Sequence, residues 1–401
     1  MTRLEKLSLL FLIPSASILA TFISPELELI KSYFSLSSNQ LSLVMTYYLM
    51  GYLVGQGVWG YLSTIFGCKI SIRVGALIAI IGAFVLLHAY CYQNYNSFIR
   101  ARMLMGFGSS AGLICGFIII KENLSKEIQK KFITLVTMFF TAAIYTSIAL
   151  SGHLLQYSSM NVVMGMFLFL GLCFYIFSLF IHSPAKLQTK QAIDNNHFDY
   201  KEIGSTVIYS LLLSITTIIT YLYSFYAPLI TSQWFSLSPQ TYSTFSFFNL
   251  FFILMGNYLF TYLNRTLSEY SICISGLSMI ILSNIALIIV DTLLHLTVSV
   301  FFICSYLMDF ILGIIYPAAT FMALEYGRSK ALSSAIMNII KLSLPIISIY
   351  FSSLFFQNKL YGFSLTIIIC SSIFLLSSTL LKVIFQSKIN RSLLDATIYK
   401  Q

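Results

Sequence analysis

Three charged side chains lie inside long apolar stretches of this sequence. Asp309 lies in CSYLMDFILGIIY, Lys341 in AIMNIIKLSLPII and Arg102 in FIRARMLMGFG. A charge near the middle of a bilayer costs about 2.5–3.5 kcal/mol on insertion scales, so such residues face a cavity or a partner inside the protein. Binding a solute, carrying a proton and pairing with one another are the chemistries that this arrangement favours.

Composition indicates what surrounds these charges. Of 401 residues, 58% are hydrophobic and only 9% are charged, whereas a soluble domain has about a quarter of its residues charged. Strand alternation is absent, and helices satisfy every backbone hydrogen bond in lipid. We therefore expect an all-α integral membrane protein embedded in a lipid bilayer.

The apolar runs predict the number of membrane spans. Each span needs roughly 20 apolar residues, and the sequence offers twelve such runs. Their predicted limits are 7–23, 40–62, 70–90, 98–120, 132–152, 161–182, 204–230, 243–263, 271–290, 297–322, 331–355 and 360–385. The first run is interpreted as an uncleaved span, because Pro25-Glu26 is a poor cleavage context.

Basic residues predict the orientation. With the N-terminus inside, Lys31, Arg100 and Lys359 fall outside, Arg102 and Lys341 fall within spans, and the other eighteen of the 23 Lys and Arg residues fall on the inner side. This positive-inside bias predicts that both termini are cytoplasmic. It also explains the net charge of +10 without a nucleic-acid partner.

Helix geometry predicts that Asp309 and Lys341 meet. Asp309 lies roughly 20 Å, and Lys341 roughly 15 Å, from the inner ends of their spans at 1.5 Å per residue. A lysine stem spans several ångströms, so the two charges are expected to pair. The pair is either one that breaks and reforms during transport or a fixed ion pair that joins two helices.

The longest polar stretch, His182–Glu202, divides the spans into six and six. We predict an N-terminal half at residues 1–182, a cytoplasmic linker at 183–203 and a C-terminal half at 204–401. Two such halves with a site between them near mid-membrane are typical of secondary transporters.

The segment from Gly51 to Gly75 carries spaced glycines and then Lys69 and Arg73. It resembles the loop between spans two and three of the major facilitator superfamily, G-x-L-A-D-R-x-G-R-[RK], which Gly60, Leu62, Gly67 and Lys69 match. Thr64 replaces the acid of that pattern. The resemblance implies the twelve-helix fold, a monomer and a gating loop formed by Gly60, Gly67, Lys69 and Arg73.

Further stretches extend the resemblance. Arg102, Gly106 and Gly108 resemble the span-four pattern R-x-x-x-G-x-G-A-A, and residues 48–56 and 317–338 are similar to drug:proton antiporters of the bicyclomycin-resistance type. The span-one acid of that branch is Thr21 here, and the span-five G-P-x-x-G-G appears only as SIALSG.

The resemblance implies that spans four and ten line the cavity and that Arg102 serves proton coupling. Alternatively, Arg102 bonds carbonyls of span one or extends to the outer surface. Glu26 and Glu28 are the acids nearest to the missing span-one position. They either substitute for it as the partner of Arg102 or, as we expect, lie in the wet outer loop.

For the small residues of span four and the aromatic residues of span seven, a purely structural role is an alternative to a functional one. Gly108, Gly112 and Gly116 form a stripe that favours close helix packing. Tyr221 and Tyr226 in span seven are candidates for contacting a lipophilic solute, or belong to the aromatic belt at the membrane surface.

Enzyme motifs and metal-ligand spacings are absent from the sequence, and the seven cysteines are scattered, so no cofactor or metal is expected. The function predicted is secondary transport across a bacterial inner membrane, with proton-coupled export of a small drug-like or siderophore-like compound. Proton-coupled nutrient uptake and a non-transporting sensor are the alternatives.

Overall fold

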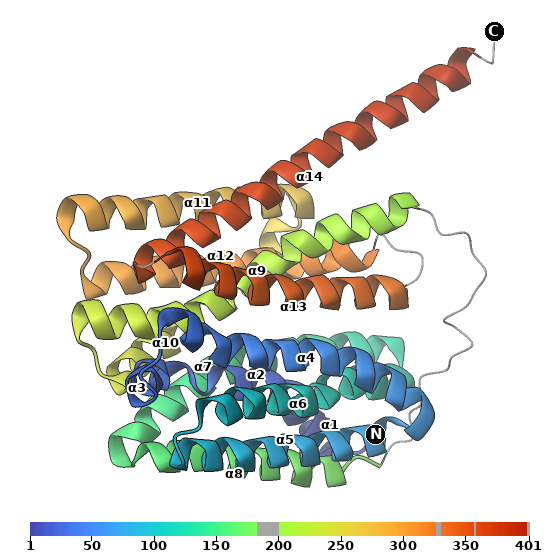
Figure 1. Ribbon diagram of the computed structural model, residues 1–401. Coiled ribbons are helices and arrows are strands. Elements are labelled where there is room, and N and C mark those ends of the chain that lie inside the picture. The colour runs from blue at the N-terminus through green and yellow to red at the C-terminus, as the bar shows by residue number, and fades with distance from the viewer. Residues whose placement is uncertain (183–199, 326–329, 357, 399–401) are drawn as a thin grey trace.

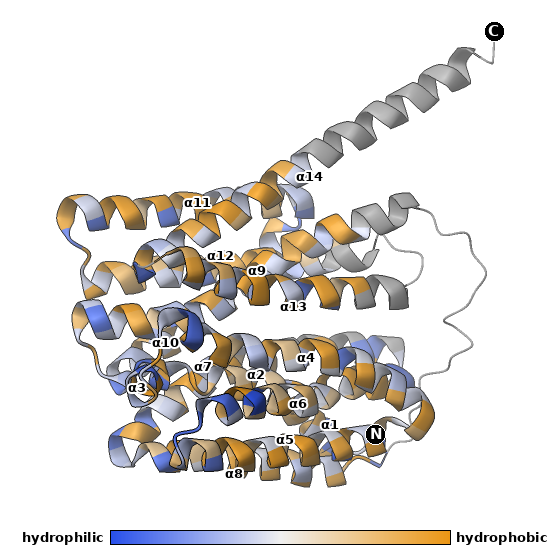
Figure 2. Cartoon of the chain, in the orientation of Figure 1, coloured by the Kyte–Doolittle hydropathy of each residue, from blue (hydrophilic) through white to orange (hydrophobic). Residues whose placement is uncertain are grey.

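The computed structural model describes residues 1–182, 200–325, 330–356 and 358–398, and this part of the chain is helical, without a strand. The long helices run side by side, and the chain forms two lobes that lie one above the other in Figure 1. Apolar residues dominate the long helices, while polar ones gather at helix ends and on α3 (Figure 2).

The first lobe holds the elements up to residue 182: α1 (Arg3–Leu12), α2 (Ser15–Thr21), the 3-10 turn η1 (Ser24–Glu26), α3 (Leu27–Tyr33), α4 (Ser38–Phe66), α5 (Cys68–Cys91), α6 (Tyr95–Asn123), α7 (Lys126–Tyr157) and α8 (Met160–Leu179). The second holds α9 (Tyr200–Phe235), α10 (Pro239–Leu263), α11 (Glu269–Leu294), α12 (Val298–Glu325), α13 (Lys330–Phe355) and α14 (Lys359–Ile398).

Eleven helical stretches of the described chain are long and apolar enough to cross a membrane. The remaining predicted span, 40–62, corresponds to α4, which has 29 residues and at 1.5 Å per residue is about 43 Å long. Large apolar side chains on the outside of the bundle, such as Phe84, Phe251 and Leu282, are 57–64% exposed, as expected where lipid replaces water.

The first span differs from its prediction. Instead of one helix over 7–23, the chain from Arg3 to Tyr33 is divided into α1, α2, η1 and α3. Pro14 lies at the N-cap of α2 and Pro25 lies in η1. Proline lacks a backbone N–H and clashes with the preceding turn, so it ends regular helix at both places.

The connection between α4 and α5 is also shorter than predicted. Helix α4 continues to Phe66 and α5 begins at Cys68, so Gly67 alone, at φ 83°, separates them. Glycine adopts this left-handed conformation without a Cβ clash. Lys69 and Arg73 therefore lie in the first turns of α5 and not in a loop.

Glycines bring α4 and α6 into backbone contact. A Cβ on Gly51 would lie 2.0 Å from the Met103 carbonyl oxygen, and one on Gly106 would lie 2.1 Å from that of Tyr48. A Cβ on Gly60, further along α4, would have only Ile114 within 4 Å, at 3.9 Å.

The stripe on α6 packs closely, as predicted, but against two helices. A Cβ on Gly108 would lie 2.5 Å from the Gly75 oxygen of α5. One on Gly112 would lie 2.2 Å from the Leu12 oxygen. Small residues thus let α6 approach neighbours on both sides, which in lipid replaces the hydrophobic drive to associate.

The lobes meet at one end of the bundle, which we call the closed end. It comprises α3, the N-terminal parts of α4, α10 and α14, and the C-terminal parts of α7, α9 and α13. Within the described residues, hydrogen bonds between lobes lie here or near mid-bundle, for example Ser42 with Ser353 at 2.9 Å and Gln233 with Glu28 at 2.9 Å. The N-terminus lies at the opposite end (Figure 1).

Gly51→Val is expected to destabilise the fold by about 3 kcal/mol, because the added side chain overlaps the α6 backbone. Gly57→Val, on the same helix with nothing within 4 Å of its Cβ position, is the matched control. Thermal unfolding in detergent measures both. Equal stability of the two variants would contradict the proposed α4–α6 contact.

Candidate functional site

Asp309 lies where the two lobes meet. It sits mid-way along α12, is 5% exposed, and its Oδ2 accepts a hydrogen bond of 2.7 Å from the Tyr145 hydroxyl of α7. Tyr145 belongs to the opposite lobe, so this bond joins the two lobes near mid-membrane. Sequence reasoning missed Tyr145, although it is a hydroxyl within the apolar run AAIYTSIAL.

The predicted pairing of Asp309 with Lys341 is wrong for this structure. The only ion pair among the described residues joins Lys31 and Glu28, at 3.5 Å. Lys341 donates instead to the Tyr316 hydroxyl at 3.2 Å and lies 5.2 Å from its ring centre. Tyr316 follows Asp309 by two helical turns, roughly 10 Å along α12, and the lysine stem extends toward the tyrosine rather than the acid.

Arg102 is buried without a carboxylate partner. Its guanidinium donates to the carbonyls of Leu19 at 2.7 Å, Ala20 at 3.1 Å and Val44 at 3.3 Å, and lies 4.4 Å from the Tyr48 ring centre. These carbonyls belong to α2 and α4, and those of α2 are near the proline-induced break in span one. The contacts match the alternative in which Arg102 bonds carbonyls of span one.

The position of the missing span-one acid carries a hydroxyl contact. Thr21 Oγ1 lies 2.7 Å from Ser147 Oγ of α7. One turn further on, Glu26 is 0% exposed and its Oε1 accepts from Ser151 Oγ at 2.7 Å. The expectation that Glu26 lies in a wet loop is therefore wrong. The sequence feature that indicates the burial of Glu26 is the apolar pattern that continues through Leu27 and Ile30 after Pro25.

Glu28 does lie nearer the surface. It is about a quarter exposed, pairs with Lys31, and accepts from Gln233 of the second lobe at 2.9 Å. Gln233 in turn accepts from Lys359 Nζ at 3.1 Å. A polar chain thus crosses from α3 to α9 and α14 at the closed end.

A buried polar group in the second lobe lies beside Asp309. Ser305, one turn before it on α12, donates to Asn249 Oδ1 of α10 at 2.9 Å. The Tyr223 hydroxyl lies 3.2 Å from Ser246 Oγ. Asn249 Nδ2 is buried without a partner in the described structure. A donor left unpaired in this way is costly unless a water or a solute binds it.

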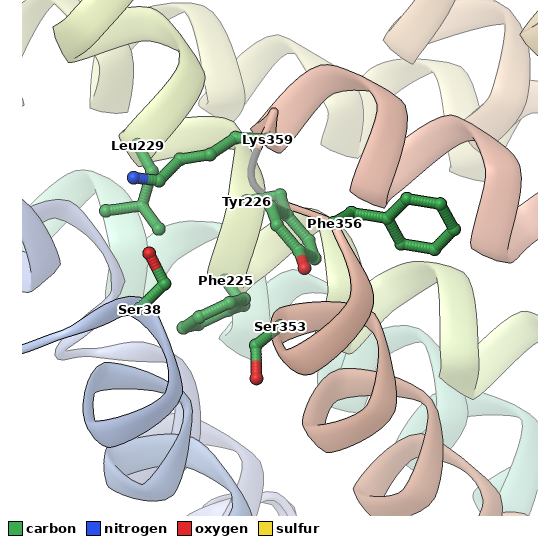
Figure 3. Close-up of a pocket in the computed structure, with 7 residues that line it drawn as sticks. All are labelled: Ser38, Phe225, Tyr226, Leu229, Ser353, Phe356 and Lys359. Carbon is green, nitrogen blue, oxygen red and sulfur yellow. The ribbon is translucent and has the colours of Figure 1, made fainter.

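Tyr221 and Tyr226 are inside the protein rather than in a surface belt, with 4% and 2% exposure. The Tyr226 hydroxyl donates to Ser352 at 2.9 Å. Tyr226 also lines a small pocket at the closed end with Ser38, Phe225, Leu229, Ser353, Phe356 and Lys359 (Figure 3). Ser38 comes from the first lobe and the other lining residues from the second, so the pocket lies between the lobes.

The proposed gating residues make few contacts in this structure. Arg73 Nη2 donates to the Leu179 oxygen of α8 at 3.3 Å, within its own lobe. Lys69 lies in the first turn of α5, next to Gly67. Residues 183–199 of the predicted linker at 183–203 lie outside the described residues.

No metal site is found: the described residues contain no group of three His, Cys, Asp or Glu side chains able to hold an ion. What the structure brings together is a buried interface between two lobes, with carboxylates on both sides, hydroxyls as their partners and aromatic walls. Such an interface can bind a solute or a proton and release it when the lobes move apart.

Comparison with known proteins agrees with this architecture. The model of the Major Facilitator Superfamily matches residues 9–349. An uncharacterized MFS-type transporter, YdgK of Bacillus subtilis (strain 168), is 22% identical over 359 residues, which cover 86% of this chain and 88% of that protein.

Solved structures share the fold. The inward-open xylose transporter XylE of E. coli superposes with a TM-score of 0.70 at 13% identity, covering 92% of this chain and 94% of XylE. A bacterial homologue of the human lysosomal transporter Spinster, inward-facing and unoccupied, gives 0.69 at 13% identity, with 94% and 98% covered. The chain is a multi-pass membrane protein of the major facilitator superfamily, and thus a transporter rather than an enzyme.

Proposed function

We propose that this chain is a proton-coupled secondary transporter that exports a small, partly lipophilic compound across a bacterial inner membrane. The observation that carries the proposal is Asp309, a buried carboxylate that accepts a hydrogen bond from Tyr145 of the opposite lobe, its single partner among the described residues. Protonating or ionising Asp309 changes the strength of a bond that must break when the lobes separate, which couples a proton to their movement.

The charge bias supports an orientation in which the closed end faces outward. With both termini in the cytoplasm, Lys31 and Lys359 lie at the outer face. The structure then corresponds to the state closed to the outside. Alternating access would require the contacts of this end to open and those of the opposite end to form.

Asp309 and Lys341 are proposed to act in different states. In the outer-closed state each is held by a tyrosine hydroxyl, from Tyr145 and Tyr316 respectively. In both contacts the tyrosine is neutral, so a partner of opposite charge arriving in another state would add the attraction between two charges and compete with the tyrosine.

Arg102 is proposed to position span one rather than to carry the proton. Its three carbonyl acceptors fix the broken segment of α2 against α4, and arginine stays charged when buried. The resemblance of residues 48–56 and 317–338 to drug:proton antiporters supports export. Uptake is the competing direction. Identifying the transported compound, and the side of the membrane on which it accumulates, distinguishes export from uptake.

Deleting the gene is expected to raise the cellular content, and lower the medium content, of at least one compound. Comparing metabolites in cells and medium, with and without the chain, measures this. Slower growth on one nutrient with internal depletion would indicate uptake instead. No change dependent on an ion gradient would support a non-transporting sensor.

Asp309→Asn is expected to reduce proton-driven flux of that compound about 5- to 150-fold, the range of a coupling energy of 1–3 kcal/mol. Tyr145→Phe should reduce it less, because the carboxylate remains. Asp291→Asn, near the end of α11, is the matched control and should behave as wild type. Vesicles with an imposed pH gradient provide the assay, and normal flux in Asp309→Asn would refute the coupling role.

Arg102→Ala is expected to lower stability by about 2–5 kcal/mol, because carbonyls buried in the lobe lose charged donors. Arg100→Ala, two residues away and exposed, is the control. Thermal unfolding by size-exclusion chromatography measures both. An Arg102→Ala protein that is as stable as wild type, yet inactive, would instead support a direct coupling role.

A further inference from the structure

A second buried carboxylate, Glu26, has no role in the function proposed above. It ends the short turn η1, where Pro25 interrupts the first span, and none of its surface is exposed. Its Oε1 accepts from Ser151 Oγ, while its Oε2 is buried and has no hydrogen-bond partner among the residues that the structure describes. An ionised carboxylate with one oxygen unpaired in such a site is strongly disfavoured.

Among the described residues, no cation pairs with this carboxylate. Lys31 pairs with Glu28, Lys359 donates to Gln233, and the Arg102 guanidinium is bound to backbone carbonyls. The described residues contain no ion pair to Glu26. A proton on Oε2 is therefore the simplest way to remove the charge.

The groups around Glu26 come from four elements. From α7, Ser151 donates to it, and His153 follows Ser151 by two residues, with its ring nitrogens near the Ala149 carbonyl and the Thr244 hydroxyl. From α10, Tyr242 is the titratable neighbour. From α9, the Ser224 carbonyl accepts from Ser24, and from α3, Glu28 contacts Gln233 and Lys31.

Glu26 is covered by the opposite lobe. Ser24, in the same turn, bonds the Ser224 carbonyl and lies 3.4 Å from the Tyr242 hydroxyl, both in the second lobe. Beside Ser151, a Cβ on Gly152 would lie 2.0 Å from Ser243 Oγ, so α7 and α10 are in direct contact there. Ser243 Oγ, like Glu26 Oε2, is buried and unpaired. Separating the lobes at this end would admit water to all of these groups.

We propose that Glu26 is a second proton-binding site, which holds a proton while the closed end is shut and releases it to outer water when that end opens. The shut state then binds one more proton at Glu26 than the open state. Its population relative to the open state falls as pH rises, by at most about tenfold per pH unit for this one proton. The inference uses the proposed function only for the orientation of the closed end.

The test measures the opening of that end directly and needs no transported compound. Spin labels are introduced through a non-natural amino acid at Tyr92 and Leu294, which are 73% and 74% exposed at the ends of α5 and α11 in opposite lobes. The seven cysteines stay unchanged. Label distances in vesicles are followed between pH 5 and 8.5 for wild type, Glu26→Gln, Glu28→Gln and His153→Gln.

In wild type, the short-distance population should increase as pH falls. Glu26→Gln mimics the protonated acid. It should remove the part of the pH dependence that Glu26 causes, which is at most about a tenfold change in the closed-to-open ratio per pH unit. It should also favour the shut state at high pH. Glu28→Gln, whose side chain is about a quarter exposed and paired with Lys31, and His153→Gln should keep the wild-type slope. Glu26→Asp provides a second variant if Glu26→Gln folds poorly.

Three results would overturn the inference. A Glu26→Gln protein with the full wild-type slope would show that another group titrates. Loss of the slope in His153→Gln would assign it to the histidine. If Na⁺ shut the closed end at constant pH in wild type but not in Glu26→Gln, Glu26 would bind a metal cation instead of a proton. Because Asp309 is unchanged in all four proteins, these outcomes are independent of the flux measured for Asp309→Asn.

Discussion

A charge placed inside the membrane must find its partners within the protein, and this constraint organises the whole structure. Lipid offers no hydrogen bonds, so Arg102, Asp309, Lys341 and Glu26 are each bound to carbonyls or hydroxyls of neighbouring helices. Three of these partnerships, those of Arg102, Lys341 and Glu26, are within a lobe and hold it together. The bond from Tyr145 to Asp309 is between lobes, and therefore belongs to one state of the transporter.

The two kinds of contact differ in what they can contribute. Arg102 donates to backbone carbonyls of α2, near the prolines that break the first span, and to one of α4. It thereby holds α2 and α4 together. Glycine contacts do the same between α4 and α6. The closed end instead uses serine, glutamine and tyrosine side chains, which exchange readily with water when the lobes part. Alternating access requires rigid lobes and a polar contact between them that can form and break.

Much of the helical framework was predictable because a span reveals itself locally. The run 271–290 corresponds to Glu269–Leu294 and 161–182 to Met160–Leu179, since length and hydropathy suffice. Prediction was wrong where one residue changes the backbone. Pro14 and Pro25 divided the first span, and Gly67 alone replaced the expected loop. Those effects depend on how neighbouring helices accommodate the break.

The sequence by itself determined that this is a helical membrane transporter with rare buried charges, because apolar run length and charge bias are properties of neighbouring residues. Only the tertiary structure decided the partners: Tyr145 for Asp309, Tyr316 for Lys341 and three carbonyls for Arg102. It also placed Glu26 inside rather than outside. The rotation and depth of each helix are fixed by packing among residues far apart in the chain. Lys341 therefore reaches Tyr316, two helical turns beyond Asp309, instead of forming an ion pair with Asp309.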